Sequence, residues 1–206
     1  MRNITLLAMC LCLVFSCKES IKEEKTVVEE QIVKNELVNS TEANAFWDAL
    51  QALCGNAFEC TLELPENDPD FGGKQLVMHV RTCEDNIIRI PFFVGDDKSR
   101  TWVLTFENDR IELKHDHRHE DGTEDDITMY GGTTTNSGQA TIQLFPADQH
   151  TKSIIPAAST NTWWITLDDK QFTYNLRRLG TDRVFRVAFD LTKTIATPEA
   201  PWGWKD

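Results

Sequence analysis

The residues that decide the fold are 100–119, which read RTWVLTFENDRIELKHDHRH. Apolar and polar side chains alternate on both sides of Asn108-Asp109, a pattern typical of two half-buried strands joined by a tight turn. The apolar face of this pair carries Trp102, Leu104, Phe106, Ile111 and Leu113. We therefore predict two neighbouring antiparallel strands with one face turned toward a core.

Three histidines continue the apolar face of the second run: His115, His117 and His119. Alternate side chains of a strand point to the same side, so these imidazoles are predicted to face a core or a cavity. Two imidazoles at His-x-His spacing can bind one metal ion, whereas residues four apart are separated by about 13 Å along a strand. One site can therefore use His115 with His117, or His117 with His119, together with ligands from elsewhere. We predict His115 and His117 as candidate ligands of a transition metal or haem. In the alternative interpretation the three histidines bind no metal and only form part of the wall of the fold, which is a barrel as argued below, and of its solvated rim.

Short alternating runs separated by turn-forming residues fill most of the chain beyond residue 57. We predict strands over 58–64, 75–82, 86–94, 100–107, 110–119, 127–131, 139–145, 162–167, 171–176 and 183–192. A helix is predicted before them, because Thr41 can cap it, Phe46 and Leu50 recur at helical spacing, and Gly55 can end it. The fold class is therefore all-β, an antiparallel up-and-down β-barrel of about ten strands preceded by one short α-helix. A β-sandwich is the alternative architecture.

Two segments lie outside this pattern. Residues 146–161 contain Ile154-Ile155-Pro156 and are predicted to form a lid or a loop over one mouth of the barrel. Residues 198–204 are too rich in proline for a strand, and their two tryptophans are predicted to pack back on the barrel surface.

The layout of one helix and about ten strands resembles the calycin-like barrels, which comprise lipocalins, fatty-acid-binding proteins and nitrobindin-type haem proteins. The Gly-x-Trp signature of lipocalins is missing, since residues 55–58 read Gly-Asn-Ala-Phe. The stretches 46–50, 100–102 and 115–122 also resemble an uncharacterised group of bacterial secreted proteins. The calycin resemblance implies a small, partly apolar ligand inside the barrel. Its candidate contacts are the three histidines, Trp102 and, if its side chain points inward, Arg89.

The first residues resemble an export signal. A positive start, Met1-Arg2-Asn3, precedes a twelve-residue apolar run that is too short to span a bilayer. The run ends in Leu13-Val14-Phe15-Ser16-Cys17, which resembles the lipobox of bacterial lipoproteins, and Cys17-Lys18-Glu19-Ser20 resembles the export segment of Bacteroidetes-type surface lipoproteins. We therefore expect lipidation at Cys17 and attachment to the cell envelope, at the outer membrane and exposed on its surface. An ordinary secretory signal with a chance cysteine is the alternative.

This interpretation divides the chain into a signal peptide over 1–16, a lipidated cysteine with a flexible acidic tether over 17–41, and a barrel domain over 42–206 that includes the Pro/Trp tail. Removing the signal peptide leaves 20 Lys and Arg against 33 Asp and Glu, a net charge of −13. Such a charge argues against nucleic acid as a partner. Contact with the membrane is expected through the lipid anchor alone.

Three further cysteines follow the lipobox: Cys54, Cys60 and Cys83. Exported proteins meet an oxidising compartment, so one disulfide and one free thiol are expected. Cys54–Cys83 is the preferred pair, because these residues lie at the ends of a predicted helix and a predicted strand. A Cys54–Cys60 pair would close a very small loop and is the alternative.

Three functions follow from these patterns. The first is non-enzymatic binding of a small, partly apolar ligand in the barrel. The second is a metal-dependent enzyme or a haem- or metal-binding protein that uses the histidine strand. The third is a structural component of the envelope without a ligand.

Overall fold

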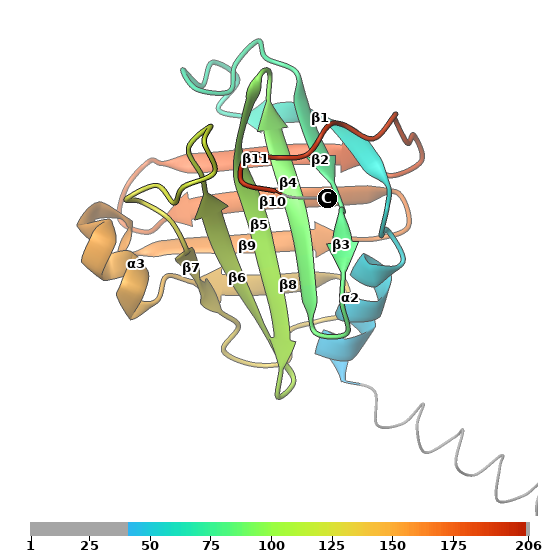
Figure 1. Ribbon diagram of the computed structural model, residues 1–206. Helices are drawn as coiled ribbons and strands as arrows, with labels where there is room; N and C mark the ends of the chain where they lie inside the picture. Colours follow the sequence, from blue (N-terminus) through green and yellow to red (C-terminus); the bar gives the residue numbers. More distant parts are fainter. Residues whose placement is uncertain (1–40, 205–206) are drawn as a thin grey trace, which may run out of the picture. The chain divides into compact units, whose positions relative to one another are not determined.

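The computed structural model describes residues 41–204, which form a β-barrel with two short α-helices at its periphery (Figure 1). The helices and the 3-10 turn are α2 (Glu42–Gln51), α3 (Gln149–Ile154) and η1 (Pro156–Ala158). The strands are β1 (Ala57–Leu64), β2 (Leu76–His79), β3 (Thr82–Cys83), β4 (Ile87–Val94), β5 (Asp97–Glu107), β6 (Arg110–His117), β7 (Tyr130–Thr133), β8 (Ile142–Pro146), β9 (Asn161–Leu167), β10 (Gln171–Arg178) and β11 (Val184–Asp190). The expected signal peptide, Cys17 and nearly all of the tether lie outside the described residues.

All strand pairs are antiparallel, and the hydrogen-bonded order is β7-β6-β5-β4-β2-β1-β11-β10-β9-β8, with β3 added beside β4. The sheet curls until its two edge strands, β7 and β8, lie next to each other. The protein is thus a nearly closed up-and-down barrel of ten strands with one short helix before it. The predicted fold class is confirmed, and the sandwich alternative is wrong.

The seam between β7 and β8 is closed by backbone contacts rather than by a strand ladder. A Cβ atom at Gly132 would lie 1.8 Å from the carbonyl oxygen of Pro146, so only glycine permits this approach. Beside it, the Asp148 N–H donates to the Gly131 carbonyl at 2.9 Å, and the Gly131 N–H donates to Thr151 Oγ1 at 2.7 Å. The Gly131-Gly132 pair therefore lets the barrel close on the α3 segment.

Helix α2 packs its apolar face into the core. Its first turn is capped by the Thr41 hydroxyl, which accepts a hydrogen bond from the Asn44 N–H at 3.2 Å. Phe46 and Leu50 are fully buried, and the Trp47 ring stacks on Phe106 with 5.5 Å between centroids.

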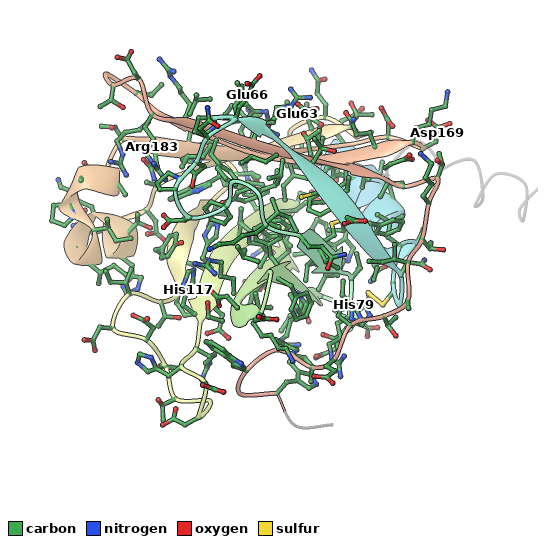
Figure 2. The ribbon with its side chains drawn as sticks, turned by 90° about the horizontal axis from the view of Figure 1, so that it is seen from above. Glu63, Glu66, His79, His117, Asp169 and Arg183 are labelled. Carbon is green, nitrogen blue, oxygen red and sulfur yellow. A yellow bond between two sulfur atoms is a disulfide. The ribbon has the colours of Figure 1, made fainter. Side chains whose placement is uncertain are left out.

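Helix α3 lies elsewhere on the rim. Seen from above, Arg183 and His117 lie on the side of the barrel where α3 is, and His79 and Asp169 lie toward the other side (Figure 2).

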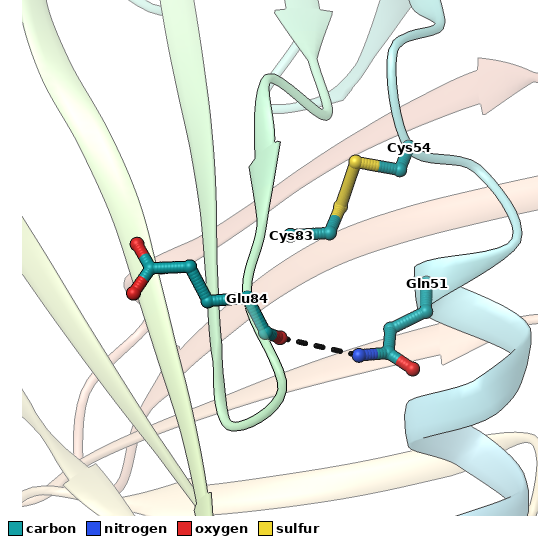
Figure 3. The surroundings of a disulfide bond; sticks show 4 residues. All are labelled: Gln51, Cys54, Cys83 and Glu84. Atoms are coloured by element: carbon teal, nitrogen blue, oxygen red, sulfur yellow. Dashed lines mark hydrogen bonds between the residues drawn. A yellow bond between two sulfur atoms is a disulfide. The ribbon is translucent and has the colours of Figure 1, made fainter.

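A disulfide joins Cys54, in the turn after α2, to Cys83 of β3 (Figure 3). The neighbouring Gln51 side chain donates a hydrogen bond to the Glu84 carbonyl at 3.2 Å, so two links hold the helix against this strand. Cys60 is a free thiol, and burial raises its pKa well above the ordinary value. The disulfide is therefore the pair that the sequence favoured.

Several strands begin or end elsewhere than predicted. The strand predicted over 75–82 is interrupted and gives β2 and β3, and the one predicted over 139–145 starts at Ile142. The strand predicted over 127–131 is shifted to β7, because the Asp125 side chain accepts the hydrogen bond of the Ile127 N–H in a turn. Ile127 is consequently exposed rather than inward-facing.

The two segments outside the strand pattern both lie against the barrel. Residues 147–160 form α3 and η1, with Asp148 as the N-cap of α3. In the C-terminal tail the Trp202 N–H donates to the Lys98 carbonyl at 3.1 Å, and the Arg81 guanidinium lies 5.4 Å from the Trp204 ring centroid. The tail thus packs on the outside of the sheet. No helix within 41–204 is long and apolar enough to cross a membrane.

Candidate functional site

A pocket of about 180 Å³ opens at the end of the barrel where α3 and η1 lie. Large apolar side chains fill the rest of the interior. The pocket is bounded by residues from the strands, from η1 and its preceding residue, and from the β1–β2 connection: Phe71, Phe92, Arg100, Thr101, Trp102, His115, His117, Tyr130, Ile155, Ala158, Asn161, Trp163, Tyr174, Leu176, Arg178, Arg183 and Phe185. Figure 2 shows His117 and Arg183 at this end of the barrel.

The strand period places a layer of polar residues at this mouth. Inward-facing side chains recur at every second position, and on β5, β6 and β10, and directly before β11, a polar residue lies two positions beyond a buried one. These end residues are Arg100 beside Trp102, His117 beside His115, Arg178 beside Leu176 and Arg183 beside Phe185. The pocket therefore has an aromatic floor and a cationic rim.

The floor is built around Trp102, which is 3% exposed. Its ring stacks on Tyr174 with centroids 4.4 Å apart and on Phe92 with centroids 4.8 Å apart. Across the pocket, Trp163 lies 5.2 Å from the His115 ring centroid. Aromatic pairs of this kind stabilise one another beyond the area they bury, so these contacts hold the rings of the floor in place.

His115 is the most constrained polar group of the pocket. Its Nδ1 lies 2.9 Å from the Tyr130 carbonyl oxygen, which can only accept, so Nδ1 carries the proton. Its Nε2 is then an acceptor, and the Tyr174 hydroxyl donates a hydrogen bond to it at 2.6 Å. Burial lowers the pKa of His115 to about 3, so the imidazole is neutral at physiological pH.

The other titratable groups of the floor are neutral as well. Burial raises the pKa of Tyr130 to about 12, against the opposing charges of Arg100 and Arg183, and raises the pKa of Tyr174 well above its usual value. The Tyr130 hydroxyl lies 3.2 Å from His117 Nε2. Burial and then the Arg100 charge lower the pKa of His117, although carboxylates from Asp125, Asp97 and Asp116 act in the opposite direction. At neutral pH these groups offer hydrogen bonds rather than charge.

The prediction of a metal site at His115 and His117 does not fit this geometry. Both ring nitrogens of His115 are engaged, one by a carbonyl and one by a hydroxyl, so neither is free to bind a metal ion. Within residues 41–204, no group of three or more His, Cys, Asp or Glu side chains is placed to hold a metal ion. A haem does not fit either. The pocket has about 180 Å³, only slightly more than the cavity of about 150 Å³ that holds one benzene, and a haem is much larger than benzene.

Two further predicted site residues lie away from the pocket. His119 is exposed because β6 ends at His117 and the chain then turns, with the Gly122 N–H donating to the His119 carbonyl at 2.9 Å. Arg89 lies between the buried Ile88 and Ile90 on β4 and therefore points outward. There it pairs with Glu84 at 2.6 Å and does not line the pocket inside the barrel.

The sequence interpretation missed the three arginines of the rim. Arg100 forms an ion pair with Asp97 and lies over the Phe71 ring at 5.5 Å. The Arg178 Nε donates to Asn161 Oδ1 at 2.9 Å. Each arginine shares its parity with the inward apolar residues of its own strand, and that signal could have identified all three.

Comparisons of the chain with protein-family models, with curated protein sequences and with solved structures found no match.

Proposed function

We propose that this protein is a lipid-anchored component of the bacterial cell envelope whose barrel binds a small, partly apolar ligand without transforming it. The observation that carries the proposal is the pocket itself: an aromatic floor with a few convergent polar groups, open at one mouth of the barrel. This combination is typical of small-molecule sites.

The hydrogen-bonding groups of the floor support binding rather than proton transfer. The neutral His115 is hydrogen-bonded to both Tyr130 and Tyr174. The pKa of each tyrosine is raised, so both phenols keep their protons at neutral pH. Such groups orient a ligand and lose little freedom when it arrives. They are poor general bases at neutral pH, since a base needs a pKa near the working pH.

The volume limits the size of the ligand. At about 180 Å³ the pocket is smaller than the roughly 300–1,000 Å³ of sites for drug-sized molecules. It is slightly larger than the cavity of about 150 Å³ that holds one benzene. The pocket therefore suits one ring with a small substituent.

The location of the protein is proposed from the sequence alone. A lipobox ending at Cys17 would give several acyl chains, which hold a protein durably at a membrane, whereas one chain does not. Mass spectrometry of the mature N-terminus tests this, with the Cys17→Ala variant as control. Acylated Cys17 in the wild type supports the anchor, and an unmodified N-terminus contradicts it.

Ligand-observed NMR against a set of single-ring compounds tests the binding function. Ile155 is half-buried at the mouth, so Ile155→Trp places a ring in the pocket entrance, and Ile127→Trp adds the same ring at an exposed position elsewhere. We expect compounds that bind the wild type and Ile127→Trp but not Ile155→Trp. Equal binding to all three proteins, or no binding to any, would contradict the proposal and favour a structural role.

A further inference from the structure

The charge of the pocket is opposite to the charge of the protein. The chain has 33 Asp and Glu against 21 Lys and Arg. Yet the 17 residues that line the pocket include three arginines and neither aspartate nor glutamate. The pocket lining thus presents positive charge and no carboxylate, which disfavours a cationic ligand.

Two of the three arginines keep their charge available. Arg100 is neutralised by Asp97 and held over Phe71. Among the described residues, the Arg178 side chain has only a neutral hydrogen-bond partner, Asn161. Arg183 forms no hydrogen bond or ion pair with its side chain in the described part of the chain, and its exposed position at the rim leaves it open to a ligand.

These two arginines lie side by side at the mouth. They flank the turn between β10 and β11, where the Arg178 N–H donates to the Arg183 carbonyl at 3.1 Å. The charge of Arg183 reaches the pocket floor, since it acts to lower the pKa of both Tyr130 and Tyr174 against the larger effect of burial. A negative group at the mouth would therefore meet two guanidinium groups, while the uncharged floor lies behind them.

We infer that the ligand is a small aromatic carboxylate, with its single ring among the floor residues around Trp102 and its carboxylate at Arg178 and Arg183. The inference rests on the proposed binding function and names its ligand class. The ring follows from the pocket volume and the aromatic walls. The carboxylate follows from the planar fork of arginine, which matches a carboxylate with two parallel hydrogen bonds.

Titration calorimetry with four probes tests the inference: phenylacetate, its neutral amide phenylacetamide, the cation benzylammonium, and inorganic phosphate. The variant is the double change Arg178→Gln/Arg183→Gln. The control is Arg177→Gln, which removes one arginine charge from the neighbouring position of β10, where the side chain is exposed and outside the pocket.

We expect phenylacetate to bind at least about tenfold more tightly than phenylacetamide, since hydrogen bonds to charged groups contribute more than neutral ones. Benzylammonium should not bind. The double variant should lose this preference for the carboxylate, and Arg177→Gln should keep it. Phosphate should bind far more weakly than phenylacetate, because it leaves the floor unfilled.

Three results would overturn the inference. Equal affinity for phenylacetate and phenylacetamide would show that the arginines do not recognise the carboxylate, while the proposed binding function would still stand. If phosphate bound as tightly as phenylacetate, the aromatic ring would contribute nothing to the affinity. If neither ring compound binds, the proposed function fails together with the inference.

Discussion

Replacement of His115 by glutamine should remove a large part of the acid sensitivity of this fold. The folded protein holds the imidazole neutral, with a pKa of about 3, whereas an unfolded chain has a histidine pKa near 6.5. Between these values the unfolded state binds a proton that the folded state excludes. Stability is therefore complete above about pH 6.5 and falls as the pH decreases toward about 3.

The magnitude follows from the width of this window. One pKa unit corresponds to about 1.4 kcal/mol, so lowering the pH from about 6.5 to about 4.5 costs on the order of 2.7 kcal/mol through His115 alone. Glutamine keeps one donor and one acceptor for the Tyr130 carbonyl and the Tyr174 hydroxyl but does not titrate. His119→Gln is the matched control, because His119 is exposed in the turn after β6.

Urea unfolding at about pH 7 and about pH 4.5, followed by tryptophan fluorescence with the disulfide intact, measures the difference. All other titrating groups are common to the three proteins, so their contributions cancel in the comparison. The wild type and His119→Gln should lose about 2.7 kcal/mol more than His115→Gln on acidification. If all three proteins lose the same free energy, His115 is not a buried neutral imidazole and the reasoning is refuted.

Three further changes test the packing of the barrel. Tyr174→Phe leaves a buried imidazole nitrogen without its donor, and we expect a loss of about 1–3 kcal/mol in urea unfolding at neutral pH; an unchanged midpoint would contradict the hydrogen bond. Gly132→Ala places a methyl group against a backbone carbonyl at the β7–β8 seam and should cost at least about 1–3 kcal/mol, visible as a lower Tm; an unaltered Tm would mean that the seam is open. Removing the disulfide with Cys54→Ser/Cys83→Ser should cost about 3–4 kcal/mol, as expected for a sequence separation of 29, and an equal stability of the oxidised wild type and the variant would show that the bond does not form.

Strand alternation predicted the fold well because it depends on burial at every second position. In β5 and β6 the predicted inward residues Trp102 and Leu113 are buried, and His115 follows them into the interior. The point at which a strand ends depends on turn hydrogen bonds instead, and alternation carries no information about these. His119 has the right parity but lies beyond the last residue of its strand.

The candidate site was predicted only in part for a related reason. Arg89 and Arg178 are both strand arginines, and only the parity of the neighbouring buried residues distinguishes the outward one from the inward one. Whether these arginines meet at one mouth of the barrel also depends on the register of β10 against β11, which places Arg178 beside Arg183. Register between strands is decided by the closed barrel as a whole.

The central claim is that the pocket at this mouth of the barrel binds a small aromatic ligand, and its most direct test follows the indole N–H signals of five of the six tryptophans in a ¹H–¹⁵N NMR titration with phenylacetate. Trp102 and Trp163 line the pocket, whereas Trp47 packs against Phe106 and Trp202 and Trp204 belong to the tail on the outer surface. We predict saturable shifts of the Trp102 and Trp163 signals with the Trp47, Trp202 and Trp204 signals unchanged. Shifts confined to the tail tryptophans, or none at saturating phenylacetate, would contradict the claim.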